Sequence, residues 1–176
     1  MRRSALLLPL ALALATAAPA ALSEGAKAPA FSAAAAQGGH KFTFSLADAL
    51  KKGPVVLYFF PAAFTPGCTV EAHEFAAAIP EFKKAGATVI GMSADPIDKL
   101  SEFSTKECSS AFPVGSATPA IVSGYDVPLK MKAGLTDRTS YVIDRTGKVV
   151  FVHSDLKPAG HVNGTLDAVK KLASRK

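Results

Sequence analysis

Residues 55–69 read VVLYFFPAAFTPGCT, and this stretch decides the fold. The run from Val55 to Phe60 is wholly apolar and rich in β-branched and aromatic residues. An unbroken apolar run of this kind predicts a strand that is buried on both faces of a sheet. The two prolines and the glycine that follow predict a shaped loop. A helix is expected from Thr69 to about Lys84, so the chain passes from a central strand through a loop into a helix.

The other periodic segments extend this pattern into an α/β fold. Further strands are expected at 42–44, 87–93, 139–143 and 149–153, with a short extended piece at 112–114. Further helices are expected at 45–50, 96–108, 118–125 and 160–173. Pro80 should kink or restart the helix that it interrupts, and Gly86 should end that helix. The order of elements predicts a three-layer α/β/α domain around a central mixed sheet.

The composition excludes several classes of protein. The chain of 176 residues is 49% hydrophobic and 19% charged, whereas disordered chains are poor in apolar residues and rich in charge. Two cysteines are too few for a disulfide-dense scaffold or a four-cysteine zinc ribbon. The net charge of +6 comes from basic residues that are scattered or paired. Because no clustered basic patch occurs, nucleic-acid binding is not expected.

Residues 1–20 have the layout of a secretory signal. Residues 1–3 (MRR) are a basic start, an uncharged run of Leu and Ala follows, and residues 18–20 (APA) fit the cleavage pattern. Residues 15–17 (ATA) offer a second cleavage site, and an uncleaved anchor helix is the alternative. We therefore predict a signal peptide over 1–20 and one domain over 21–176. The predicted protein is exported, periplasmic or secreted, and has no membrane contact after cleavage.

Cys68 lies where the chain passes from the buried strand into the helix. Free backbone N–H groups and the helix dipole both favour a thiolate at such a position. Thr65 and Thr69 add hydroxyl groups that could bond the sulfur or a small polar substrate. A buried structural cysteine is the alternative, since free cysteines are common in protein cores. A cysteine used only for packing, however, does not need the Thr-Pro-Gly sequence that precedes this one.

Acidic residues near the helix starts are interpreted as ordinary helix-end and surface charges. Glu71 and Glu74 follow Cys68 closely, and acids are stabilised at the positive end of a helix. The same interpretation covers three acids of the following helix, which are Asp95, Asp98 and Glu102.

Residues 61–69 (PAAFTPGCT) resemble the P-x-x-x-T-x-x-C active-site motif of the peroxiredoxins. Residues 64–72 (FTPGCTVEA) are similar to the Q-type, or bacterioferritin-comigratory, branch of that family. Residues 25–31 (GAKAPAF) resemble its opening segment, and Arg138 matches an arginine that precedes one of its strands. The resemblance covers nearly all of residues 21–176 and implies a thioredoxin-like fold.

This resemblance implies a thiol peroxidase, an antioxidant oxidoreductase with no cofactor and no bound metal. Cys68 would attack the O–O bond of hydrogen peroxide or an organic hydroperoxide and become a sulfenic acid. Thr65 would hold the peroxide oxygens, and Pro61 would shield the sulfur from water. Arg138 would favour the thiolate and stabilise the leaving oxygen. For Arg138, a surface ion pair is the alternative.

Cys108 is the candidate for resolving the sulfenic acid. Many Q-type members carry a cysteine five residues after the first, where this chain has His73. We expect an intramolecular Cys68–Cys108 disulfide, formed after local unwinding of the helix. The expected reductant is external and resembles thioredoxin or glutaredoxin, or is a small thiol. A permanent disulfide, a spectator Cys108 and resolution across a dimer remain alternatives, although a monomer is expected.

A copper or zinc site is the main rival interpretation. The candidate ligands beside Cys68 are the four histidines of the chain, which are His40, His73, His153 and His161. Exported thioredoxin-like copper chaperones use such residues, but they normally pair two cysteines in a C-x-x-x-C motif that this sequence lacks. The alternative function is therefore an exported thioredoxin-fold redox or copper-binding protein without peroxidase turnover.

Overall fold

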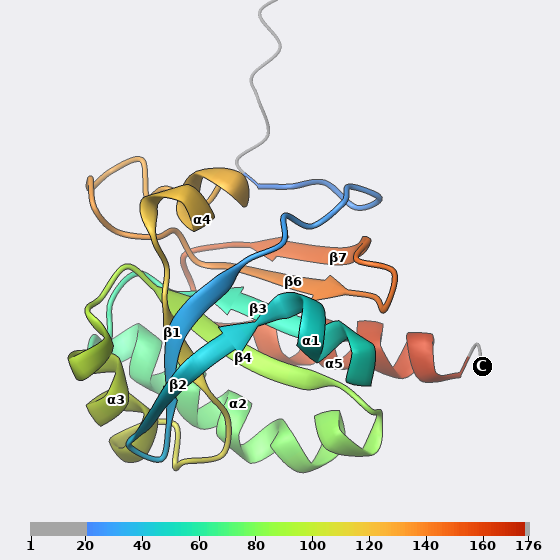
Figure 1. The fold of residues 1–176 in the computed structure, drawn as a ribbon, viewed down its shortest axis with the longest axis horizontal. Coiled ribbons are helices and arrows are strands. Elements are labelled where there is room, and N and C mark those ends of the chain that lie inside the picture. The colour runs from blue at the N-terminus through green and yellow to red at the C-terminus, as the bar shows by residue number, and fades with distance from the viewer. Residues whose placement is uncertain (1–20, 175–176) are drawn as a thin grey trace, which may run out of the picture.

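The computed structural model describes residues 21–174 as a single sheet with helices on both faces (Figure 1). The strand order is β2-β1-β5-β4-β3-β6-β7. The strands are β1 (Ser32–Gln37), β2 (His40–Ser45), β3 (Val55–Phe59), β4 (Thr88–Ser93), β5 (Val114–Ser116), β6 (Thr139–Ile143) and β7 (Val149–Ser154). The helices are α1 (Leu46–Lys52), α2 (Pro66–Lys84), α3 (Ile97–Lys106), α4 (Pro119–Gly124) and α5 (His161–Ala173).

The signal peptide predicted over residues 1–20 lies outside the described residues. Within residues 21–174, no helix combines the length and the apolar character that crossing a bilayer requires.

The sheet is mixed, as predicted, and β3 lies inside it. This strand pairs in parallel with β4 and antiparallel with β6. All five of its residues are buried, which confirms the strand predicted from the apolar run. Successive side chains of a strand point to opposite faces, so β3 supplies both layers of the core.

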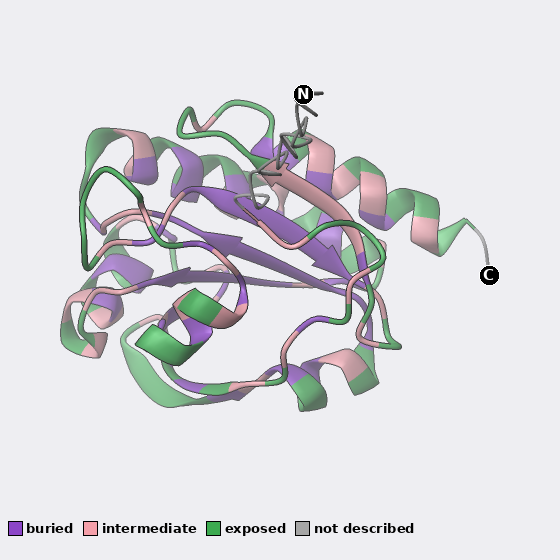
Figure 2. Cartoon of the chain, turned by 90° about the horizontal axis from the view of Figure 1, so that it is seen from above, coloured by how far each residue is buried: buried purple, intermediate pink, exposed green. Residues whose placement is uncertain are grey.

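Two apolar clusters fill the spaces between the sheet and its helices. Val56 and Tyr58 of β3 belong to the cluster that packs under α2, α3 and α5. Val55, Leu57 and Phe59 point the other way, into the cluster that includes residues of α1 and α4. Figure 2 shows buried strands between helices whose outer sides are exposed. This arrangement is the α/β/α layering that the sequence predicts.

The hairpin of β1 and β2 differs from the sequence prediction, which has only a short strand at 42–44. The stretch over β1 is mostly alanine, and alanine has a low intrinsic preference for strands. Pairing overrides this preference, because β1 is hydrogen-bonded to β2 on one side and to β5 on the other. Gly38 and Gly39 form the expected turn, with φ of 56° and 82°.

Three boundaries also differ from the prediction. Helix α2 begins at Pro66 rather than Thr69 and runs through Pro80 without a break. Strand β5 starts two residues later than the expected extended piece at 112–114. Helix α3 ends at Lys106, so Cys108 lies just beyond that helix rather than within it. The first of these shifts places Cys68 within the opening turn of α2.

Candidate active site

Cys68 is the third residue of α2 and follows the loop that leaves the carboxyl end of β3. Pro66 takes the first helical position, where its missing N–H costs nothing, and Thr65 before it is extended at φ −81° and ψ 148°. N–H groups of the first turn have no partner inside the helix, so they offer donors to an anion at this point. The Cys68 side chain is only 2% exposed, which shields the sulfur from bulk water.

Arg138 is the cationic side chain that faces this sulfur. It directly precedes β6, is 4% exposed, and its Nη2 donates to Cys68 Sγ at 3.4 Å. Its Nε donates to the carbonyl oxygen of Leu156 at 2.8 Å, and its Nη1 forms a buried ion pair with Glu71. This burial rules out the surface ion pair considered as the alternative for Arg138. The guanidinium group is fixed by three partners and lies between a thiol and a carboxyl group.

Glu71 is a component of the site that sequence reasoning missed. It was expected as a helix-start charge, but its side chain is fully buried. Oε2 pairs with Arg138, while Oε1 has no hydrogen-bond partner among the described residues. Burial raises the pKa of Glu71 to about 8, although the Arg138 guanidinium acts to lower it. Its spacing of three residues from Cys68, which places both on one helix face, is the signal that could have found it.

His161 is a second missed component, and it comes from the start of α5. Its side chain is fully buried, and Nδ1 lies 3.8 Å from Oε1 of Glu71. Nε2 is 2.9 Å from the backbone carbonyl of Asp155, which can only accept, so Nε2 carries the hydrogen. Nδ1 is then an acceptor, and it lies 2.8 Å from the hydroxyl of Ser140. Burial lowers the pKa of His161 to about 4, which favours the neutral ring.

The loop between β3 and α2 is held in place by Asp95. The Asp95 carboxylate accepts from the N–H of Ala63 at 2.7 Å and from the Ser93 hydroxyl at 2.8 Å. It also pairs with Lys99 at 2.8 Å. Interpreting Asp95 as a solvated helix-start charge was therefore wrong, because its oxygens fix the backbone of the loop. Asp98 and Glu102 do carry exposed charge, as expected.

Thr65 and Pro61 lie in this loop, at either end of it. Pro61 is partly buried, directly after β3 and Phe60. Thr65 is exposed, and its hydroxyl donates to the carbonyl of Ala62 at 2.9 Å. In this state, therefore, the Thr65 hydroxyl bonds the loop rather than the sulfur. Phe64 between them has a positive φ of 66°, a conformation that non-glycine residues seldom adopt.

Cys108 is a free thiol that lies in the same apolar cluster as Cys68. Both cysteines are free in this structure, so the permanent disulfide considered as an alternative is not formed. Cys108 is fully buried, and burial raises the pKa of its thiol. Its backbone N–H donates to the carbonyl of Phe103 at 3.1 Å, which attaches it to the end of α3.

The histidines of the copper interpretation do not gather around Cys68. Over residues 21–174, no three side chains of His, Cys, Asp or Glu come close enough to share a metal ion. His73 is exposed, and its Nε2 lies 2.9 Å from Glu107 next to Cys108. His153 packs against His161, with ring centroids 4.4 Å apart.

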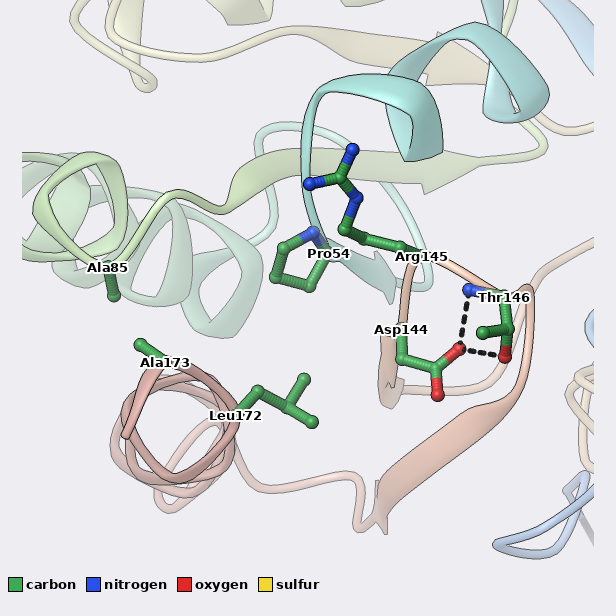
Figure 3. A pocket seen from close by; sticks show the side chains of 7 residues that line it. All are labelled: Pro54, Ala85, Asp144, Arg145, Thr146, Leu172 and Ala173. Atoms are coloured by element: carbon green, nitrogen blue, oxygen red, sulfur yellow. Dashed lines mark hydrogen bonds between the residues drawn. The ribbon is translucent and has the colours of Figure 1, made fainter. Parts of the chain in front are cut away.

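A pocket of about 210 Å³ lies near the start of β3, away from the loop that leads to Cys68. Figure 3 shows the side chains that line it. It is lined by Pro54, just before β3, and by residues of the β6–β7 turn and the end of α5. The five residues of β3 span roughly 17 Å between this pocket and the loop that leads to Cys68. The Asp144 carboxylate is occupied by Thr146, accepting from its N–H at 2.9 Å and from its hydroxyl at 2.6 Å. The pocket therefore has no part in the thiol site.

Comparisons with known proteins agree with this geometry. The model of the AhpC/TSA family matches residues 25–152. The chain is 35% identical over 152 residues to Peroxiredoxin Q, chloroplastic, of Suaeda salsa, which covers 86% of this chain and 69% of that relative. It is also 35% identical over 128 residues to Peroxiredoxin Bcp of Xanthomonas campestris pv. campestris, covering 69% of this chain and 79% of the relative.

Solved structures show the same fold. Peroxidoxin BcpB from Mycobacterium tuberculosis superposes with a TM-score of 0.76 at 29% identity, over 85% of this chain and 97% of that one. Peroxiredoxin Q of Xanthomonas campestris gives a TM-score of 0.68 at 32% identity, over 80% and 90% of the two chains.

The comparisons contradict the expected localisation. The relative from Suaeda salsa is named as chloroplastic, which is a different compartment from the one expected. The prediction of an exported, periplasmic or secreted protein is therefore wrong. The prediction rested on the layout of residues 1–20. A basic start without acidic residues and rich in small residues is also found in segments that direct proteins to other compartments.

The family match spans well over half of the chain, and it includes both the Cys68 motif and Arg138. Two relatives above 30% identity are each covered over more than two thirds of their length. The thioredoxin-like layering of the sheet and helices is shared with the solved peroxiredoxin structures. The chain therefore belongs to the AhpC/TSA family and is a peroxiredoxin, a thiol-dependent peroxidase.

Proposed function

We propose that Cys68 is the peroxidatic thiol of a Q-type peroxiredoxin. The observation that carries this proposal is the contact of 3.4 Å between Cys68 Sγ and Nη2 of the buried Arg138. A fixed guanidinium in a site shielded from water stabilises negative charge more strongly than an exposed one does. The names of the relatives from Suaeda salsa and Xanthomonas campestris support the Q-type assignment.

The reaction follows from the groups around the sulfur. The Cys68 thiolate attacks one oxygen of a hydroperoxide, so that an S–O bond forms while the O–O bond breaks. Sulfur is oxidised to sulfenic acid, and the peroxide is reduced to water or an alcohol. Arg138 donates to the oxygens on which charge develops, and it is already in place before the substrate arrives.

Thr65 and Pro61 complete the substrate site in this proposal. The Thr65 hydroxyl is exposed beside the helix start, and a rotation of χ1 exchanges its bond to Ala62 for one to a peroxide oxygen. Pro61 covers the approach to the sulfur from the β3 side and presents no N–H that would hold water there. Asp95 supports both residues indirectly, because it fixes the N–H of Ala63 between them.

Cys108 resolves the sulfenic acid in the next step. Its thiol condenses with Cys68–SOH, so that an S–S bond forms and water leaves. A disulfide needs Cα atoms within about 7 Å. In this proposal, local opening of the first turns of α2 and of the segment after α3 brings the two sulfurs together. An external reductant of the thioredoxin type then restores both thiols by exchange. We propose that the protein acts as a monomer, since both cysteines are supplied by one chain.

Peroxide consumption by the wild-type protein and two variants tests these assignments. Cys68→Ser should abolish turnover, whereas Cys108→Ser should still react once with one equivalent of hydrogen peroxide. Mass spectrometry of the oxidised wild-type protein should show a monomeric disulfide that Cys108→Ser lacks. Equal consumption of peroxide by Cys68→Ser would contradict the assignment of Cys68. Oxidised wild-type protein in which Cys108 remains a free thiol would contradict the role of Cys108.

A further inference from the structure

We propose that the Tyr58 hydroxyl carries the proton of the Cys108 thiol to the hydroxide that leaves Cys68 when the disulfide forms. This inference rests on the proposed role of Cys108 as the resolving cysteine. Tyr58 lies in β3, before the motif of residues 61–69. It adds a proton-transfer group to the second step of the reaction, for which the motif supplies none.

The side chain of Tyr58 lies across the neighbouring strand β4. Tyr58 pairs with Gly91 of β4, and Gly91 pairs with Val114 of β5, so these residues form one row across three strands. A Cβ atom at Gly91 would lie 2.6 Å from Cζ of Tyr58 and 2.7 Å from its hydroxyl oxygen. The tip of the tyrosine therefore occupies the space that this glycine leaves free. Its hydroxyl points along the row, away from β3 and toward β5.

Cys108 lies in the segment that leads into β5. The N–H of Ala111 donates to the Cys108 carbonyl at 2.9 Å, and the next residue, Phe112, has its ring centroid 6.0 Å from that of Tyr58. Tyr58, Cys68 and Cys108 are all buried in the same cluster, on the face of the sheet that α2, α3 and α5 cover. The hydroxyl thus points from the central strand toward the segment that carries the resolving thiol.

The Tyr58 hydroxyl is a donor without a partner in this state. The side chain is 1% exposed, and the hydroxyl has no hydrogen-bond partner among residues 21–174. By contrast, Tyr125 and Tyr141 in the opposite core both donate to carbonyl oxygens. An unpaired buried hydroxyl costs free energy, and a catalytic role is one of the few reasons for which native proteins retain one. In this proposal, the donor finds its acceptor only when Cys68 carries an oxygen atom.

Burial keeps both Tyr58 and Cys108 protonated before the reaction. It raises the pKa of the Tyr58 hydroxyl well above its usual value, and among the neighbouring ionisable groups Cys108 raises it most. Burial also raises the pKa of the Cys108 thiol. Because a free thiolate or phenolate is unfavourable in this core, the proton of Cys108 leaves as the S–S bond forms.

The atoms and electrons of this step balance. The Cys108 sulfur attacks the sulfur of Cys68–SOH, so that an S–S bond forms while the S–O bond breaks and leaves its electron pair on oxygen. The departing hydroxide takes the O–H proton of Tyr58 and becomes water. Tyr58 takes the S–H proton of Cys108 in exchange, so it is a neutral phenol before and after the step. Cys108 is oxidised and the Cys68 sulfur is reduced to the level of the disulfide.

The ring of Tyr58 is held in place while the thiols move. Strand β3 is paired on both sides, and the ring stacks on Phe75 with centroids 4.2 Å apart. Ser109 and Ser110, directly after Cys108, have positive φ of 49° and 55°, which non-glycine residues adopt only at a cost in free energy. The segment of Cys108 is therefore strained, whereas the proton-transfer group is fixed before the two cysteines meet.

Kinetics that separate the two steps test this proposal. Reduced full-length Tyr58→Phe is mixed with one equivalent of hydrogen peroxide. Stopped-flow measurement follows the oxidation of Cys68, and quenched-flow with mass spectrometry follows the disulfide. Oxidation of Cys68 should keep the wild-type rate, whereas disulfide formation should slow by about tenfold or more, because a positioned proton-transfer group is lost. Under excess peroxide, the longer-lived sulfenic acid should yield more sulfinic acid at Cys68.

Matched variants separate the hydroxyl from general effects on the core. Tyr141→Phe removes a hydroxyl from the opposite core, and it should keep the wild-type rates of both steps. Gly91→Ala keeps the tyrosine but displaces its hydroxyl, so it should slow the same step as Tyr58→Phe. Gly115→Ala is its control, because a Cβ atom there would crowd Met92 at 2.7 Å from Sδ instead of Tyr58.

The outcomes distinguish this proposal from the one on which it rests. If Cys108 stays a free thiol in the oxidised wild-type protein, its resolving role fails, and the role of Tyr58 fails with it. If the disulfide forms as fast in Tyr58→Phe as in the wild type, only the role of Tyr58 fails. Equal slowing of both steps would also overturn that role, since it would indicate a disturbed core. Should Tyr58→Phe not fold, the rate of disulfide formation in Gly91→Ala against Gly115→Ala decides in the same way.

Discussion

Arg138 joins three parts of the chain at a single side chain. Its guanidinium donates to Cys68 in α2, pairs with Glu71 one turn later, and donates to the Leu156 carbonyl before α5. These contacts use the planar fork of the guanidinium group, which a lysine ammonium cannot reproduce. The position should therefore be sensitive to geometry as well as to charge.

We predict that Arg138→Lys slows the reaction of Cys68 with hydrogen peroxide by about 100-fold or more. The loss of one fixed donor at a developing anion typically costs ~3–4 kcal/mol of transition-state stabilisation. Stopped-flow measurement of Cys68 oxidation checks this. Arg145→Lys, at an exposed arginine that donates to the Lys51 carbonyl, is the matched control and should react like the wild type. A loss of less than tenfold in Arg138→Lys would contradict the prediction.

The residues of the site were predictable to different degrees. Cys68 could be located because a strand, a Pro-Gly loop and a helix start are all local patterns. The inward orientation of Glu71 was not predictable in the same way, since acids at a helix start usually face water. His161 carries no local signal at all. Its place beside Glu71 depends on how α5 packs against α2, which is a long-range property of the fold.

At the scale of elements, the start of α2 is held by contacts that come from outside the helix. Asp95, after β4, holds the loop through the N–H of Ala63. His73, on the exposed face of α2, pairs with Glu107 just beyond α3. The second of these contacts connects the helix of Cys68 with the segment of Cys108.

We predict that Asp95→Asn reduces the loss of stability in acid. Burial opposes the charge on Asp95, but hydrogen bonds from Lys99, Ala63 and Ser93 outweigh it and lower the pKa. A carboxyl group whose pKa is lowered on folding contributes stability above its unfolded value, about 3.8, and loses it as the pH falls through the folded value. Chemical denaturation from pH 6 to pH 2 should show a flatter acid limb in the variant.

The matched control for this titration is Asp98→Asn, since the Asp98 side chain is 83% exposed. It should keep the acid limb of the wild-type protein. An equal flattening in both variants would mean that general charge repulsion, rather than the anchoring of the loop, controls stability in acid.

We predict that His73→Ala speeds formation of the Cys68–Cys108 disulfide by about two- to fivefold. The contact to Glu107 is partly exposed and is worth up to ~1 kcal/mol, and its loss favours local opening of α2. The rate is measured by quenched-flow and mass spectrometry after one equivalent of peroxide. Lys106→Ala breaks an ion pair with Glu102 that stays within α3, and it should leave the rate unchanged. A slower rate in His73→Ala would refute the prediction.

The elements themselves were largely predictable, because their apolar patterns are periodic and their ends carry caps. Ser45 accepts from the N–H of Asp48 at 3.2 Å, and Thr118 from that of Ile121 at 3.3 Å, where the sequence predicts helix starts. The prediction failed for β1, whose alanines favour a strand only when partners exist on both sides. That requirement is a property of the sheet rather than of the segment.

At the scale of the whole molecule, the sheet separates two cores with different polar content. The core beneath α2, α3 and α5 holds both cysteines and Tyr58, whose hydroxyl has no hydrogen-bond partner among residues 21–174. The opposite core holds Tyr125 and Tyr141, whose hydroxyls donate to backbone carbonyls at 2.7 and 2.8 Å. Of these three buried tyrosines, Tyr58 is therefore the one whose hydroxyl has no hydrogen-bond partner among the described residues.

We predict opposite effects of removing these hydroxyl groups. Tyr58→Phe should leave the free energy of unfolding unchanged or raise it by about 1 kcal/mol, because an unpaired buried hydroxyl is removed. Tyr125→Phe and Tyr141→Phe should each lower it by about 1 kcal/mol, since a buried carbonyl loses its donor. Urea denaturation of the three variants provides the comparison. A destabilised Tyr58→Phe protein would show that this hydroxyl has a partner.

The position of β3 inside the sheet affects which parts of the protein open during oxidation and reduction of the thiols. Amide hydrogens of β3 are bonded within the sheet between β4 and β6, so their exchange with solvent should require global unfolding. The turns around Cys68 and Cys108 lie outside these paired strands. Their amide hydrogens should exchange through small local openings. Repeated oxidation and reduction would then loosen only the segments that carry the thiols. The strand that supports them would keep its protection through every cycle.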